Sequence, residues 1–112
     1  MNRIVRVMVT GVGGGGIGKQ IIKSLRLANA NYEIIGTDIT SLSKGLMEVD
    51  YPYIVPKASE NNYIACLVAL IKKHNVEVLF PGSEPELKII SKERKAFSDM
   101  GVLLPINPPK FS

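Results

Sequence analysis

Short runs of β-branched and aliphatic residues alternate with amphipathic segments along the whole chain. Apolar runs of this length, bounded by glycine, proline or polar residues, predict buried strands. Apolar residues that recur every three or four positions predict helices facing a core. The predicted strands are residues 3–10, 32–38, 53–55, 76–80 and 102–104. The predicted helices cover 17–28, a segment marked by Tyr63 to Ile71 with Ser59 as candidate N-cap, and a segment from the 83–86 turn through Phe97, while one helical turn is expected at 44–49.

This alternation of strands and helices predicts an α/β fold, because strands joined through helices pair in parallel and are covered on both faces. We expect a small doubly wound, Rossmann-like sheet of about five strands in the order 3-2-1-4-5. Pro52 and Pro56 flank the third strand and place it near an edge. Ligands of such sheets gather at the carboxyl ends of the strands, where residues 11–18, 37–38 and 81–86 fall.

The length of 112 residues allows one small domain, which we place at residues 1–105. The proline-rich residues 106–112 are interpreted as the start of a linker. No run approaches the roughly 20 apolar residues that cross a bilayer, and the net charge of +4 is mild and dispersed, which does not favour nucleic acid. The single cysteine, Cys66, suits a reducing cytoplasm. Together with the single histidine, His74, it is too little for a zinc site, and no metal ligands are predicted.

The glycine-rich segment 11–18 fits G-x-G-x-x-G in two registers, after a strand and before a helix. Backbone N–H groups freed of side chains, at a helix N-terminus, can approach an anion or a phosphate. Asp38 stands 20 residues after Gly18, where dinucleotide-binding proteins place a ribose-binding acid. The glycines can equally serve a tight turn with no ligand. The candidate residues of this loop are Gly13, Gly14, Gly15, Gly16 and Ile17.

A second unusual segment is the acidic turn Pro81-Gly82-Ser83-Glu84-Pro85-Glu86-Leu87. Ser83 three positions before Glu86 matches a capping box, and acids in a first helical turn complement the helix dipole. Capping alone therefore accounts for the pattern. The alternative is that Ser83, Glu84 or Glu86 faces a ligand at the carboxyl edge. Cys66 and Tyr63 are expected to belong to the core side of the second helix, and His74 to the end of that helix.

Together these segments resemble the N-terminal domain of ATP-grasp ligases, and most closely that of enzymes similar to the carbamoyl-phosphate synthase large subunit. The segments that carry the resemblance are residues 9–18, 35–38, 50–56 and 79–87. The resemblance implies a Rossmann-like pre-ATP-grasp domain that shapes the acceptor-substrate side of a site. It also implies that ATP and magnesium are held mainly by domains that follow, in the same or a separate chain.

The resemblance predicts a carboxylate–amine ligase domain that is not catalytic alone and takes part in binding a small carboxylate or amine substrate. One alternative is the NAD(P)-binding module of an oxidoreductase, favoured by the glycine registers and Asp38. Another is a stand-alone ligand-binding domain, and a homodimer is a further expectation. Tyr53 and Lys57 also form the Y-x-x-x-K spacing of short-chain dehydrogenases, but Pro56 between them breaks the helix that this pair needs.

Overall fold

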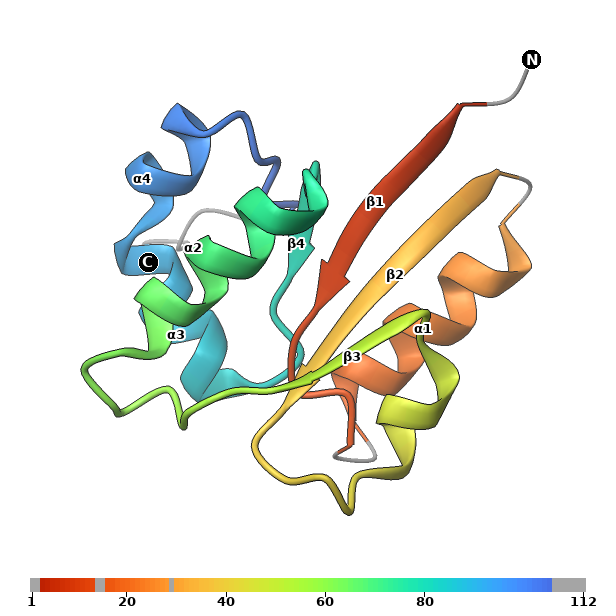
Figure 1. The fold of residues 1–112 in the computed structure, drawn as a ribbon, viewed down its shortest axis with the longest axis horizontal. Helices are drawn as coiled ribbons and strands as arrows, with labels where there is room; N and C mark the ends of the chain where they lie inside the picture. The colour runs from red at the N-terminus through yellow and green to blue at the C-terminus, as the bar shows by residue number, and fades with distance from the viewer. Residues whose placement is uncertain (1–2, 14–15, 29, 106–112) are drawn as a thin grey trace, which may run out of the picture.

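The computed structural model describes residues 3–13, 16–28 and 30–105. Its elements alternate as the sequence predicts (Figure 1). In chain order they are β1 (Ile4–Val9), α1 (Ile17–Leu27), β2 (Asn31–Asp38), the 3-10 helix η1 (Lys44–Glu48), β3 (Tyr51–Ile54), α2 (Tyr63–His74), β4 (Val78–Phe80), α3 (Glu84–Lys92) and α4 (Arg94–Asp99). Gly14, Gly15 and the predicted linker 106–112 lie outside the described residues. No helix of the described part is long and apolar enough to cross a membrane.

All strand pairs are parallel, and the sheet has the order β3-β2-β1-β4. Val7 of β1 lies opposite Ile34 of β2 and Val78 of β4, so β1 is central. The chain leaves β1 toward one side for β2 and β3, and returns to the other side for β4. The Rossmann-like fold class is therefore confirmed, with a reversal of strand order between β1 and β4.

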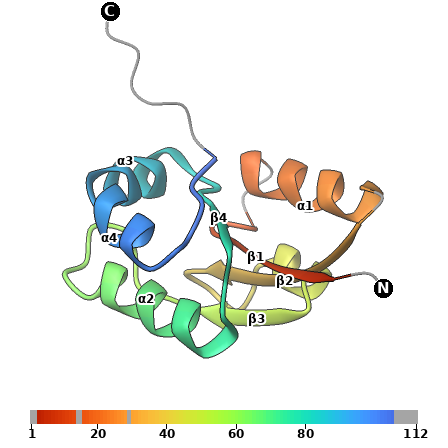
Figure 2. The same ribbon diagram turned by 90° about the horizontal axis from the view of Figure 1, so that it is seen from above.

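Helices cover both faces of the sheet, as predicted: α1 lies on one face and α2 on the opposite one (Figure 2). Alternate residues of β1 belong to two hydrophobic cores, one on each face of the sheet. Val7 and Val9 pack with Ile22 of α1, and Met8 packs with Leu67 of α2. The core on the α2 face also contains Ile90 of α3 and Phe97 of α4. A strand buried on both faces needs apolar residues at successive positions, which explains the continuous hydrophobic run of β1.

The sheet has four strands among the described residues rather than about five. Residues 102–104 lie where the fifth strand is expected, but they make a single parallel bridge between Leu103 and Val78. Leu103 donates to the carbonyl of Glu77 at 2.8 Å and accepts from Leu79 at 3.0 Å. The next donor on this side of the ladder would be residue 105, which is proline and has no N–H. Pairing therefore stops after one residue.

Local boundaries differ from the sequence prediction in two further ways. The N-cap of α2 is Asn62, and the prediction of Ser59 is wrong because the helix begins only at Tyr63. The predicted third helix is divided at Glu93, whose N–H bonds to the carbonyl of Ile90 at 3.0 Å. A bond to the residue three positions back tightens the last turn of α3, and α4 then restarts in a new direction.

Candidate ligand site at the carboxyl edge of the sheet

The loops after β1, β2 and β4 meet at one edge of the sheet, where the strand order reverses. The N–H of Gly82 donates to the hydroxyl of Thr10 at 3.1 Å, which ties the loop after β4 to the end of β1. The N–H of Val12 donates to the carbonyl of Thr37 at 3.2 Å, which ties the glycine loop to β2. The glycine loop and the acidic turn, far apart in sequence, are thus held against each other.

The acidic turn presents one buried carboxylate, that of Glu86, which is only 7% exposed. The hydroxyl of Tyr63, from α2, donates to its Oε2 at 2.5 Å. The hydroxyl of Ser83 donates to its Oε1 at 2.8 Å. The same Ser83 oxygen accepts from the backbone N–H of Glu86 at 3.4 Å, so Ser83 is the N-cap of α3 as predicted. Glu84, two residues earlier, is exposed and belongs to no hollow described below.

Glu86 lies in the wall of a hollow of about 520 Å³. Gly11 also lines this hollow, and it packs so closely on the acid that a Cβ there would stand 2.5 Å from Oε1 of Glu86. Gly11 also has φ +61°, a conformation that favours glycine. The hollow is completed by Asp38, Ile39, Lys57, Ala58, Ser59, Gly82, Ser83 and Pro85. It contains charges of both signs, and its size suits a small metabolite.

A second hollow of about 470 Å³ lies beside the first, and Asp38 borders both. Its walls include Gly13, Lys19, Ser43 and Lys44. Gly13 is pressed against the acid, because a Cβ at Gly13 would lie 2.2 Å from Oδ2 of Asp38. The other oxygen of Asp38 accepts from the backbone N–H of Ile39 at 2.7 Å. The structure thus brings Gly13, Asp38, Ser83 and Glu86 to one edge.

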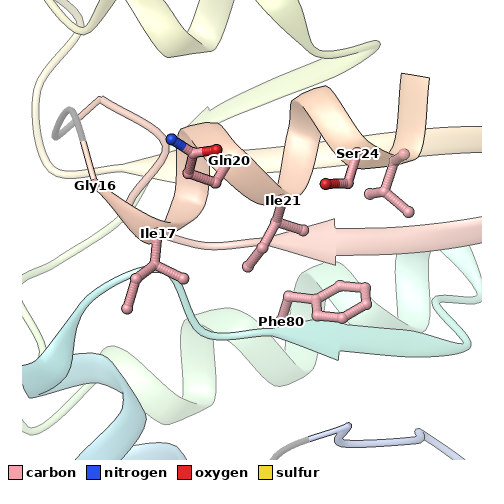
Figure 3. A pocket seen from close by; sticks show the side chains of 7 residues that line it. Gly16, Ile17, Gln20, Ile21, Ser24 and Phe80 are labelled. Carbon is pink, nitrogen blue, oxygen red and sulfur yellow. The ribbon is translucent and has the colours of Figure 1, made fainter. Parts of the chain in front are cut away.

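Gly16 and Ile17, the remaining described candidates of the glycine loop, border a different hollow. It measures about 480 Å³ and lies between α1 and β4 (Figure 3). Ile17, Ile21 and Phe80 point into it, and none of its lining side chains is titratable. This apolar space is not suited to acid–base or ionic chemistry.

The two helix N-termini at this edge differ in charge. The first turn of α1 has no acidic residue and no side-chain cap, and it carries Lys19. The first turn of α3 has Glu84 and Glu86 and is capped by Ser83. The positive end of the α1 dipole is therefore open to an anion, whereas that of α3 is already compensated by acids.

Burial, and next the negative charge of Glu86, raise the pKa of Tyr63 above its usual range. The phenol therefore stays protonated and acts as a donor to the carboxylate. The core position predicted for Tyr63 is confirmed, while Thr10 and Lys57 are site residues that the sequence pattern does not indicate. A buried tyrosine hydroxyl needs a partner, and this requirement was the available signal for Tyr63.

Other chemistry-bearing residues lie away from this edge. His74 ends α2, as predicted, and its Nε2 is 2.6 Å from the hydroxyl of Tyr53. Burial, followed by the charge of Lys73, lowers the pKa of His74. Cys66 is half-buried on α2. Tyr53 belongs to strand β3 and not to a helix, so the Y-x-x-x-K spacing has no catalytic geometry.

Within residues 3–13, 16–28 and 30–105, no group of three or more His, Cys, Asp or Glu side chains is placed to hold a metal ion. The acids at the edge, Asp38 and Glu86, line the same hollow as Lys57 and do not form a carboxylate cluster. This donor set does not fit a magnesium site formed by these residues alone.

The fold and the site define a class: a Rossmann-like α/β domain that offers a small polar pocket at its topological switch point. The family pattern described as "PylC-like, N-terminal domain" matches residues 7–105. The chain belongs to this family, whose members are the pre-ATP-grasp, Rossmann-like domains of ATP-grasp ligases. A comparison with curated proteins gives no match.

Solved structures share the fold at low sequence identity. A long-chain acyl-CoA carboxylase of several domains matches with a TM-score of 0.69 and 16% identity, over 91% of this chain and 10% of that one. The dTDP-glucose 4,6-dehydratase of Bacillus anthracis, in complex with NAD, matches with a TM-score of 0.62 and 20% identity, over 89% of this chain and 36% of that one. A short-chain dehydrogenase from Mycobacterium smegmatis matches with a TM-score of 0.55 and 14% identity, over 71% of this chain and 36% of that one. The chain thus spans at most about a third of these proteins, and the likeness concerns the fold alone.

Proposed function

We propose that this chain is the N-terminal, substrate-side domain of an ATP-grasp ligase that joins a carboxylate to an amine. The family to which residues 7–105 belong supports the ligase class. The observation that carries the assignment to the substrate side is the pocket in which Glu86 meets Gly11. It lies at the edge where an α/β sheet binds ligands, and its charged walls suit a polar metabolite.

In this proposal ATP and magnesium are bound by ATP-grasp domains that follow the present residues in the same protein. When bound there, they supply phosphorylation of the substrate carboxylate. The residues of this chain bind and orient a substrate: Gly11 lets the glycine loop pack against Glu86, Ser83 and Tyr63 fix the carboxylate of Glu86, and Lys57 adds a positive charge to the lining of the pocket. The uncapped N-terminus of α1 is suited to an anionic group of the substrate.

The test is ADP release by the protein that the complete open reading frame encodes. The assay contains ATP, Mg²⁺, and one carboxylate and one amine at a time. Release that requires both a carboxylate and an amine supports the proposal. Release driven by bicarbonate would further support the closer likeness to carbamoyl-phosphate synthase. Residues 1–112 alone are expected to release no ADP above background. Absence of ADP release from the longer protein with every pair tested would contradict the ligase assignment.

A second candidate function is binding of NAD or NADP, and one contact favours it. Asp38 ends β2 and lies against Gly13, the arrangement in which dinucleotide-binding proteins hold a ribose. Titration of the chain with NAD and NADP tests this candidate. Saturable binding that Asp38→Asn weakens would favour the NAD(P)-binding function over the ligase function.

A further inference from the structure

Glu86 has a feature that capping does not explain. Glu86 occupies the third helical position, which a capping-box acid takes, and its Oε1 accepts from the Ser83 hydroxyl at 2.8 Å. Its other oxygen turns inward and accepts from Tyr63 on another helix, a contact that capping does not require. Taking a carboxylate out of water is costly unless it gains a compensating partner.

Within the described residues, no lysine, arginine or histidine nitrogen lies within 4.0 Å of Glu86. The ion pairs found there are Arg3–Glu77, Arg6–Glu33, Arg26–Asp50 and Lys95–Asp99. The partners of Glu86 are two neutral hydroxyls, one on each oxygen. These donors orient the carboxylate, and apart from the dipole of α3 it has no positive partner among the described residues.

The carboxylate of Glu86 borders open space. Glu86 lines the 520 Å³ hollow, although the backbone of Gly11 packs against one side of its Oε1. Each carboxylate oxygen can accept more than one hydrogen bond, so acceptor positions remain after the Tyr63 and Ser83 hydroxyls are bound. An N–H donor that carries a positive charge would satisfy these positions and the charge together.

We propose that this pocket binds the primary ammonium group of a small amine substrate, with the carboxylate of Glu86 as its direct ligand. Tyr63 and Ser83 are positioning residues that hold this carboxylate in place. Lys57, which also lines this pocket, disfavours a second positive charge and suits the carboxylate end of an amino acid. The inference rests on the proposed function in one respect: it takes the ligand to be the amine partner of the ligase.

The first experiment is a titration of the ¹⁵N-labelled chain followed by amide chemical shifts, with 4-aminobutanoate and butylamine as probes and butanoate as the control. Saturable shifts at Gly11, Ala58, Gly82 and Ser83 are expected with both amines and not with butanoate. Equal shifts with butanoate, or amine shifts located elsewhere, would overturn the proposal.

The matched variants are Glu86→Gln and Glu84→Gln, which remove the same charge from the same helical turn. Glu86→Gln is expected to weaken amine binding 10- to 100-fold, as for a lost charge-assisted hydrogen bond. Glu84→Gln is expected to leave the affinity within about twofold, because Glu84 is exposed to solvent. Equal weakening by both variants would refute a local role of Glu86.

Tyr63→Phe provides a second route if Glu86→Gln does not fold. It keeps the carboxylate but removes one orienting donor, so amine affinity is expected to fall several-fold while the amide spectrum remains that of a folded chain. Unchanged affinity in Tyr63→Phe would overturn the positioning role. Because these measurements need no turnover, amine binding without ADP release by the longer protein would refute the ligase function and leave the ammonium site standing.

Discussion

Gly82→Ala is expected to be one of the most damaging single-methyl changes in the protein. Gly82 is buried in the turn between β4 and α3. A Cβ at this position would lie 1.8 Å from the carbonyl oxygen of Thr10 and 3.0 Å from Cα of Gly18. Both neighbours are backbone atoms, one directly after β1 and one in α1, so no side-chain rotation can relieve the overlap.

The cost follows from how far the backbone must move. Real Cβ contacts do not fall below 3.0 Å, so the turn and β1 must separate by about 1 Å. Overpacking of this kind costs about 1–3 kcal/mol. The separation also disrupts the hydrogen bond from the Gly82 N–H to the Thr10 hydroxyl, worth about 1 kcal/mol. The free energy of unfolding should therefore fall by about 2–4 kcal/mol, a large part of the stability of a small domain.

Urea unfolding followed by far-ultraviolet circular dichroism measures this loss, and Gly101→Ala is the matched control. Gly101 has φ +80° but nothing within 4 Å of its would-be Cβ. Its replacement therefore adds backbone strain of about 1–2 kcal/mol without any overlap. If Gly82→Ala destabilised the protein less than Gly101→Ala, the close approach of the two loops would be wrong.

Three further outcomes are expected. Phe97→Ala should lower the free energy of unfolding by about 3–5 kcal/mol in urea titrations, since the ring is fully buried, and a loss below 1 kcal/mol would contradict its place in the core. Ser83→Ala should cost about 1–2 kcal/mol in the same titration, because it removes both the cap of α3 and one donor to Glu86. Burial lowers the pKa of His74, so the unfolded chain binds the proton first. Stability is then full above about pH 6.5 and falls as the pH decreases below it. Melting temperatures between pH 5 and 8 should show this decline, and His74→Gln should flatten it.

Much of the fold could be predicted from the sequence because its signals are local. Successive apolar residues in β1 require burial on both faces, and the spacing from Ile17 onward requires a helix with one apolar face. The predicted boundaries that are wrong depend on contacts between elements. The fifth strand ends after one bridge because Pro105 meets the ladder of β4, and this depends on the register of Leu103 against Val78.

The candidate site divides in the same way. The sequence by itself determined that a glycine loop, Asp38 and an acidic turn follow three strands, and parallel pairing brings such ends to one edge. It also determined that Ser83 caps α3, since capping acts within one turn.

Only the tertiary structure decided that Glu86 is buried while Glu84 is exposed, because the choice depends on where α2 places the hydroxyl of Tyr63. The approach of Gly11 to Glu86 likewise arises from the packing of the β1 and β4 loops. Local sequence patterns do not distinguish two acids in the same helical turn. Their surroundings are formed by residues distant in sequence. The physical reason is that burial and charge compensation are properties of the packed molecule, not of the segment.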